Sequence, residues 1–106
     1  MACWAAGERS DVADLTVALL NGIASGHEDA LCREAAVASL GSLGHEAGRA
    51  VVLAALMDRP PVRRRAVLAL ASFEGPDVEA ALERALRDRD WQVRQAAEDL
   101  LGGAER

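Results

Sequence analysis

Three segments of this chain align with one another almost position for position. They begin at Cys32, Val62 and Val93, and each carries Arg in second place, Ala in fifth place and Leu in ninth. A helical unit that recurs at such a period is typical of a solenoid, in which each repeat buries its apolar face only against its neighbours. The spacing therefore predicts an all-α stack of repeats. It names no substrate and no partner.

Composition agrees with a helical fold. Of the 106 residues 51% are apolar, while the aromatic residues are limited to Trp4, Phe73 and Trp91. A chain rich in Ala and Leu favours closely packed helices over strands. The length corresponds to one domain with a single modest core.

Charge and targeting signals narrow the function classes. The formal net charge is −5 at pH 7, so the long-range field repels phosphate and disfavours general binding to nucleic acid or anionic membranes. The first residues lack the basic and apolar regions of a secretory signal, and the longest apolar run, 50–57, is too short to cross a bilayer. With only two cysteines, the chain is expected in a reducing cytoplasm.

Helix boundary signals divide the chain into six expected helices with short connections. The expected ranges are 11–24, 29–43, 46–57, 60–73, 76–87 and 91–101. The boundary signals are Ser10 or Asp11 as an N-cap, Gly44 as a left-handed C-terminal residue, Pro60-Pro61 and Pro76 in first turns, Asp90 as an N-cap, and Gly102-Gly103 as a terminator. Leu15, Leu19 and Ile23 form one apolar face of the first expected helix.

Two patterns carry a family resemblance. Asp58…Val62-Arg63-x-x-Ala66-x-x-Ala69-Leu70 and Asp88…Val93-Arg94-x-x-Ala97-x-x-x-Leu101 resemble HEAT-like repeats, of the short bacterial type also found in phycobilisome lyases. The resemblance covers residues 11–102 and implies a right-handed α-solenoid of three helical hairpins. The expected organisation is an N-terminal extension (1–10), one repeat domain (11–102, with repeats 11–43, 46–73 and 76–101) and a C-terminal tail (103–106).

The resemblance also implies a structural role for the repeated arginines. In such repeats an Asp in the preceding turn commonly pairs with the Arg, and the pairs form a ladder between repeats. Here the arginines are Arg33, Arg63 and Arg94, and the acidic candidates are Asp58, Asp88 and Asp90. Ala36, Ala66 and Ala97 occupy one equivalent position, where a bulky side chain would force paired helices apart.

The second helix of each repeat lines the concave surface in the resembling family, and we expect recognition there. The candidate partner-binding residues are Glu34, Val37, Arg64, Val67, Leu68, Gln95 and Asp99. Val67 and Leu68 allow two interpretations. Either they form an apolar contact point for a partner, or Val67 packs on the next repeat and Leu68 is an isolated surface leucine. Glu98 and Asp99 at the matching sites predict that the third repeat caps the stack.

The function that these features favour is a non-catalytic protein–protein interaction module, an adaptor or regulatory scaffold, that binds another protein or a second copy. The resemblance to the lyases leaves one alternative, a small-molecule or chromophore-binding protein. Nucleic-acid binding through the basic cluster from Arg59 to Arg65 is a weaker hypothesis, because Arg63 is expected to be structural and stacking aromatics are missing.

Chemistry-bearing residues are few. Cys32 falls at a position occupied by Val in the other repeats and is expected to act as a small core residue. His27 and His45 fall in interhelical turns without the spacing of metal ligands. No catalytic residue, metal or cofactor is expected, and the chain is not expected to be an enzyme.

Overall fold

The computed structural model describes the backbone of residues 2–105 and the side chains of residues 12–102. This part of the chain is all helical and contains no strand. The six α-helices are α1 (Ala2–Gly26), α2 (Ala30–Leu43), α3 (Arg49–Ala54), α4 (Pro60–Ala69), α5 (Pro76–Ala85) and α6 (Trp91–Glu105). Short 3-10 turns flank α3 on both sides (Glu46–Gly48 and Ala55–Met57) and continue α4 (Leu70–Ser72).

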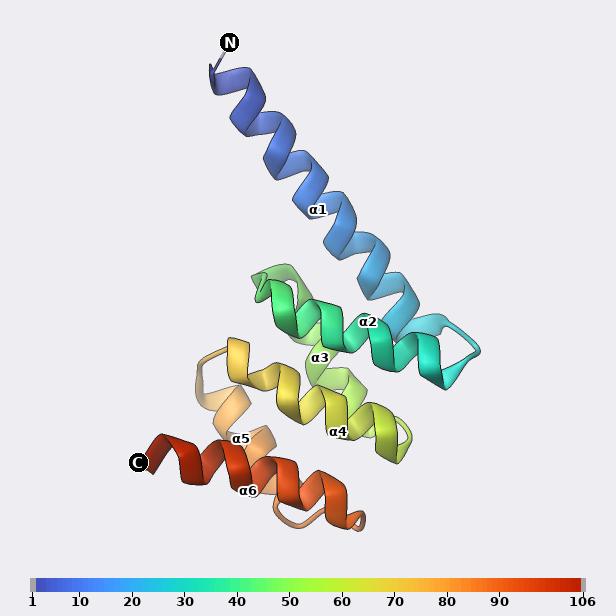
Figure 1. The fold of residues 1–106 in the computed structure, drawn as a ribbon, viewed down its shortest axis with the longest axis vertical. Helices are drawn as coiled ribbons and strands as arrows, with labels where there is room; N and C mark the ends of the chain where they lie inside the picture. The colour runs from blue at the N-terminus through green and yellow to red at the C-terminus, as the bar shows by residue number, and fades with distance from the viewer. Residues whose placement is uncertain (1, 106) are drawn as a thin grey trace.

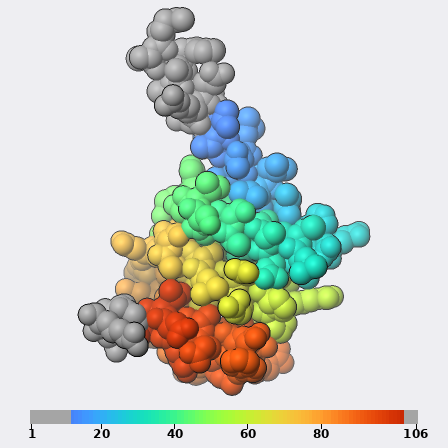
Figure 2. Space-filling model, in the orientation of Figure 1, coloured from blue at the N-terminus to red at the C-terminus, as the bar shows by residue number. Residues whose placement is uncertain are grey.

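The helices form two layers. α2, α4 and α6 lie side by side in one row, with α2 packed on α4 and α4 packed on α6, and we call these three helices the second-helix row (Figure 1). α3 and α5 lie behind this row, and α1 lies across its α2 end (Figure 1). In the space-filling view, successive segments of the chain lie one below another from α1 to α6 (Figure 2). The molecule is therefore a stack with two different ends.

Several predicted boundaries are confirmed. Gly44 follows α2 with a left-handed backbone (φ 61°), and its N–H donates to the Leu40 carbonyl. Pro60 and Pro76 each begin a helix, where a missing N–H has no intrahelical partner to lose. The Asp90 carboxylate accepts the backbone N–H groups of Gln92 and Val93 at the start of α6.

Two predicted boundaries are wrong. α1 begins at Ala2, so neither Ser10 nor Asp11 is its N-cap, because the preceding Ala-rich residues are themselves good helix formers. α6 continues through Gly102-Gly103 to Glu105. A glycine ends a helix when it turns left-handed, and the left-handed glycines of the described backbone are Gly44 and Gly75.

The core runs along the contact between the two layers. Its largest fully buried side chains are Val17, Val37, Leu40, Val52, Val62, Val67, Leu70 and Val93. The equivalent alanines Ala36, Ala66 and Ala97 are all buried. The apolar face predicted for the first helix is mostly outside the core, because Leu15 and Leu19 face solvent while Val17 and Ala24 face inward.

Gly41 sets the separation of α2 and α4. A Cβ atom at Gly41 would lie 2.7 Å from the Cβ and 2.8 Å from the Cα of Ala69. The two backbones are therefore in contact, and the Ser72 hydroxyl donates to the Gly41 carbonyl beside this crossing. At this point α2 and α4 can approach so closely only because one residue has no side chain.

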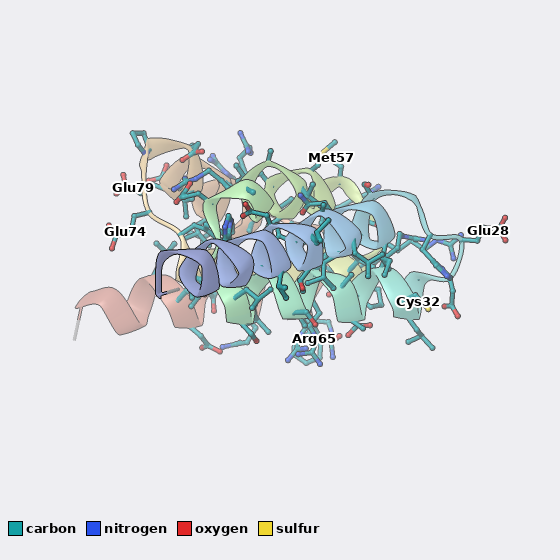
Figure 3. All side chains as sticks on the ribbon, turned by 90° about the horizontal axis from the view of Figure 1, so that it is seen from above. Glu28, Cys32, Met57, Arg65, Glu74 and Glu79 are labelled. Atoms are coloured by element: carbon teal, nitrogen blue, oxygen red, sulfur yellow. The ribbon has the colours of Figure 1, made fainter. Side chains whose placement is uncertain are left out.

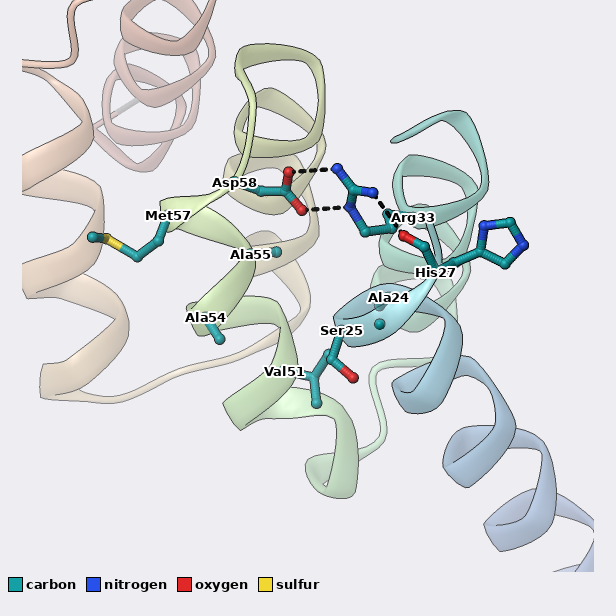
Figure 4. Close-up of a pocket in the computed structure, with 10 residues that line it drawn as sticks. Ala24, Ser25, His27, Arg33, Val51, Ala54, Ala55, Met57 and Asp58 are labelled. Carbon is teal, nitrogen blue, oxygen red and sulfur yellow. Dashed lines mark hydrogen bonds and ion pairs between the residues drawn. The ribbon is translucent and has the colours of Figure 1, made fainter. Parts of the chain in front are cut away.

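The arginine ladder is present and uses Asp58 and Asp88, two of its three predicted acidic residues, but each arginine pairs with a different turn from the one predicted. Arg33 donates through Nε and Nη2 to the Asp58 carboxylate at 2.9 and 3.0 Å (Figure 4). Arg63 binds Asp88 in the same bidentate way, at 3.0 and 2.9 Å. In both rungs the carboxylate comes from the turn inside the next hairpin, between α3 and α4 for Asp58 and between α5 and α6 for Asp88, and not from the turn that precedes the arginine's own helix. The preceding turn contributes backbone carbonyls only, such as that of Asp58 to Arg63.

The reason is geometric. Each arginine reaches back to the carbonyl of the turn before its helix with Nη1, which leaves the Nε–Nη2 edge pointing toward the next repeat. One arginine thus joins two successive turns. Asp90 does not pair with an arginine of the ladder, because its carboxylate caps α6.

The two ends of the ladder are different. Arg94 donates to the Asp88 carbonyl at 2.7 Å, as Arg33 does to the His27 carbonyl, but no carboxylate among the described side chains binds its outer edge. His27 stands in the first turn where Asp88 stands in the third. Its Nδ1 accepts the N–H of Asp29, just as the Asp88 carboxylate accepts that of Asp90.

The rungs shift the protonation of both carboxylates. The Arg33 hydrogen bond lowers the pKa of Asp58, with partial burial acting in the opposite direction. At Asp88 burial favours the neutral acid, but the hydrogen bonds from Arg63 and from the Asp90 N–H outweigh it, so the pKa is again lowered. Both carboxylates are therefore held in the ionised form that the arginines require.

Candidate functional site

The outward face of the second-helix row carries two hollows on either side of Leu68. The hollow between α2 and α4 has a volume of about 320 Å³ and includes Arg65, Ala38 and Ser72 in its lining. The hollow between α4 and α6 has a volume of about 160 Å³. Arg65 points away from the ribbon on this side, and Met57 points away on the opposite side (Figure 3). Leu68 is half-buried and lines both hollows.

The α4–α6 hollow combines apolar and polar groups. α4 contributes Arg64 and Leu68, one helical turn apart, and α6 contributes Trp91, Gln92, Gln95, Ala96 and Asp99. The Trp91 side chain is 64% exposed although it is the largest apolar group of α6. The exposed indole and the half-buried leucine leave apolar area in contact with water. Tryptophan is enriched at surfaces where proteins bind one another.

The structure separates the seven predicted contact residues into three groups. Arg64, Leu68, Gln95 and Asp99 come together around the α4–α6 hollow. Glu34 lies on the same face but is bound to Arg65, with 3.0 Å between Oε1 and Nε. The third group, the two valines, does not reach the surface.

The accessibility predicted for Val37 and Val67 is wrong, because both side chains are fully buried. Val67 packs in a cluster with Ala85, Val93 and Ala97, that is, on the following repeat. A position five residues after the inward-facing Val62 points along the stack toward the next helix of the row, and not outward. Of the two interpretations of Val67, packing on the next repeat is the correct one.

Ion pairs divide the basic cluster between Arg59 and Arg65. Arg63 belongs to the ladder, and Arg65 is neutralised by Glu34. Arg64 forms no ion pair with any side chain in the described range 12–102 and lines the hollow next to Leu68. Two of the four arginines of the cluster are therefore held in ion pairs, and of the other two, Arg59 and Arg64, it is Arg64 that lies beside apolar neighbours.

Trp91 is the part of this site that sequence reasoning missed. It lies outside the aligned nine-residue segment, so the repeat pattern predicts no role for it. Its signal was its place directly after the capping residue Asp90, at the exposed start of α6. A bulky aromatic residue at a first-turn position has few core neighbours to pack on.

A larger cleft of about 390 Å³ lies on the edge of the stack where α1, α2 and α3 meet (Figure 4). Its polar wall consists of Arg33 and Asp58, which bind each other, and of His27, whose carbonyl binds Arg33. Because these groups already satisfy one another, the cleft is a structural joint and offers little to a ligand.

The remaining candidates for chemistry have structural surroundings. His27 and His45 each accept a backbone N–H through Nδ1, which confirms their place in turns. Cys32 is partly exposed, so the expectation of a buried core position is wrong there, because no earlier helix of the second-helix row covers α2. Within residues 12–102 no group of three His, Cys, Asp or Glu side chains is arranged to hold a metal ion.

Comparison with known proteins identifies a family. A family model described as HEAT repeats matches residues 50–103, a segment that includes α4, α5, most of α6 and both walls of the α4–α6 hollow. A search of curated protein sequences finds no match to the chain. None of the described helices is long and apolar enough to cross a membrane.

Proposed function

This chain belongs to the HEAT-repeat family, and we propose that it is a non-catalytic adaptor or regulatory module that binds another protein through the α4–α6 hollow. HEAT repeats generally act as scaffolds for protein interaction. The observation that carries the proposal is the meeting of an exposed Trp91, a half-buried Leu68 and an Arg64 without an ion-pair partner among the described side chains.

The hollow defines the chemistry of its ligand. A volume of about 160 Å³ takes one apolar side chain, which would be desolvated between Leu68 and Trp91. The Arg64 guanidinium next to it would bind a carboxylate and fix the orientation of the segment. The matching sequence in the partner is therefore a large apolar residue near Asp or Glu.

The same proposal covers the architecture and setting of the module. We take α1–α2, α3–α4 and α5–α6 as three hairpins of a right-handed solenoid, with the second-helix row on its concave side, working in the cytoplasm. A chromophore or other small molecule is a poorer fit to the α4–α6 hollow, because pockets for such ligands have volumes of about 300–1,000 Å³ and enclose most of the ligand. The α4–α6 hollow is smaller than this range.

A displayed library of random peptides, selected on the full chain, tests this proposal without knowledge of the natural partner. Selected peptides are expected to share an apolar residue with Asp or Glu close to it. Selection on Arg64→Gln should keep the apolar preference and lose the acidic one, while Leu68→Asp should abolish enrichment. Isothermal titration of one selected peptide then gives the loss for each variant.

Met57→Asp is the matched control, because Met57 is equally apolar, 89% exposed and on the opposite side of the molecule. It should select the same peptides as the unmodified chain. A shared motif that survives both Arg64→Gln and Leu68→Asp, or no shared motif at all, would reject the hollow as the binding site.

A further inference from the structure

The three ladder arginines are oriented alike, but in the described structure only two of them bind a carboxylate. Each donates through Nη1 to a backbone carbonyl of the turn before its own helix. Arg33 and Arg63 also bind one aspartate each through Nε and Nη2. The corresponding edge of Arg94 has no carboxylate among the side chains of residues 12–102. One half of a third rung is therefore present in α6.

The Arg94 guanidinium is held in place before any ligand binds. Its Nη1 donates to the Asp88 carbonyl at 2.7 Å and to the Arg89 carbonyl at 3.2 Å, and the residue is half-buried. An arginine that is already ordered loses less conformational entropy when it binds a ligand. Its Nε–Nη2 edge carries two N–H donors in the geometry that matches a carboxylate.

The two filled rungs show which ligand this edge accepts. Asp58 and Asp88 each accept two hydrogen bonds from their arginine, at 2.9 and 3.0 Å. Each lies in a turn in front of a helix and also accepts a backbone N–H of its own turn, from Arg59 or Asp90. The turn thus fixes the carboxylate for the arginine. By equivalence, the ligand that suits Arg94 is an aspartate in a turn.

Glu98 indicates what kind of protein can supply this aspartate. It lies one helical turn after Arg94, at the position where Val37 and Val67 are buried against the next repeat. A further repeat of the same kind, or a second copy stacked head to tail, would bury the Glu98 carboxylate without a partner. A different protein with Lys or Arg opposite Glu98 avoids this cost. The end of α6 therefore favours a partner whose charges are complementary to both residues.

We propose that Arg94 is a binding site for an aspartate in a turn of another protein, and that Glu98 pairs with a basic residue beside that aspartate. The partner then completes the third rung of the ladder. This site is separate from the α4–α6 hollow, because neither Arg94 nor Glu98 lines the hollow. The proposal therefore does not depend on what the hollow binds.

A displayed library of peptide loops closed by a disulfide, selected on the full chain, tests this proposal. Loops are used because the filled rungs receive their aspartate from turns. Arg94→Gln is expected to weaken a loop that binds this site by about tenfold or more, since two charged hydrogen bonds are lost. Arg94→Lys should recover little of the affinity, because an ammonium group cannot form the bidentate pair. Isothermal titration gives each affinity.

Arg64→Gln is the matched control, because it removes the same group from the α4–α6 hollow and leaves Arg94 in place. Loops that bind Arg94 should keep their affinity for Arg64→Gln, whereas ligands of the hollow should lose it, so each site is tested separately. Glu98→Gln should remove any preference for Lys or Arg beside the aspartate. Arg94→Gln is expected to keep the helical circular dichroism of the unmodified chain, since Gln is a good helix former.

The proposal is overturned if no selected loop depends on Arg94, or if the loops that depend on it share no aspartate. It is also overturned if sedimentation equilibrium shows dimers of the full chain that Arg94→Gln abolishes, because the carboxylate would then come from a second copy.

Discussion

The two ends of the stack differ at equivalent positions, and the difference shows how a repeat chain uses its residues. At the α2 and α4 positions that face the next repeat, Val37 and Val67 are fully buried, whereas Glu98 of α6 is exposed to water. At the opposite end α1 turns a row of leucines outward. The same place on the second helices is therefore core or cap, according to whether a further repeat covers it.

The ladder gives the same lesson for polar groups. Arg33 and Arg63 join successive turns through bidentate pairs, while Arg94 keeps only the backbone half of that arrangement. His27 replaces the aspartate in the first turn. The polar end and the apolar end are thus distinguished at two independent sets of positions, and each set can be tested by exchanging residues between repeats.

The largest effect is expected from moving the cap residue into the stack. Val67→Glu should lower the free energy of unfolding by on the order of 3–5 kcal/mol, because it buries an unpaired carboxylate. The reverse exchange, Glu98→Val, should stay within about 0.5 kcal/mol, since the site faces water. Urea unfolding followed by circular dichroism measures both. Similar losses of unfolding free energy at the two positions would contradict the assignment of Val67 as buried and Glu98 as exposed to solvent.

Removing an arginine should matter more within the ladder than at its end. Arg63→Gln is expected to cost about 2–3 kcal/mol, because the partly buried Asp88 carboxylate loses a charged hydrogen-bond partner. Arg94→Gln should cost about 1 kcal/mol or less, since it loses hydrogen bonds to backbone carbonyls only. The two variants are compared by their urea midpoints, and an equal loss would contradict the assignment of Arg94 as an open end.

Adding a methyl group should have opposite effects on stability at the two aligned glycines, Gly41 and Gly102. Gly41→Ala is expected to lose about 1–3 kcal/mol, because the new Cβ collides with the Ala69 backbone. Gly102→Ala, at the equivalent place in α6, meets no atom within 4 Å and should gain up to about 1 kcal/mol from helix propensity. Thermal unfolding of both variants gives the comparison. A stabilising Gly41→Ala would mean that α2 and α4 are further apart than described.

The smallest effect is a dependence on pH. The pKa values of Asp58 and Asp88 are lowered on folding, so their stabilisation is complete above the unfolded value of about 3.9 and is lost as the pH falls toward the folded values. Unfolding free energy should therefore decrease below about pH 4. Arg63→Gln should show a shallower decrease, because Asp88 no longer has its partner. An identical slope in that variant would remove the ladder as the cause.

Local features of the sequence predicted much of this structure. Gly44, Pro60 and Asp90 fixed boundaries because each acts on its own backbone neighbours. Ala66 was predicted as a close contact because three aligned repeats share a small residue there. These signals are local or repeated, so one chain is enough to see them.

Other features depend on what each element packs against. Leu15 and Leu19 look like core residues in the sequence, and only the position of α1 at the end of the stack shows that they face outward. Val67 was predicted to be accessible for a related reason. The hydrophobic period of α4 alone does not show that α6 covers this side of the helix. His27 gave no signal that it occupies a ladder position, because its turn differs in residue type from the other two.

The contrast between the two ends is tested most directly by hydroxyl-radical footprinting of the unmodified chain in dilute solution. Oxidation is compared with that of Met57, the most exposed large apolar residue on the opposite side. Leu15 and Leu19 are predicted to be oxidised readily, whereas the buried Leu40 and Leu70 are predicted to be protected. Protection of Leu15 and Leu19 to the level of Leu40 and Leu70 would contradict a stack whose α1 end turns apolar side chains toward solvent.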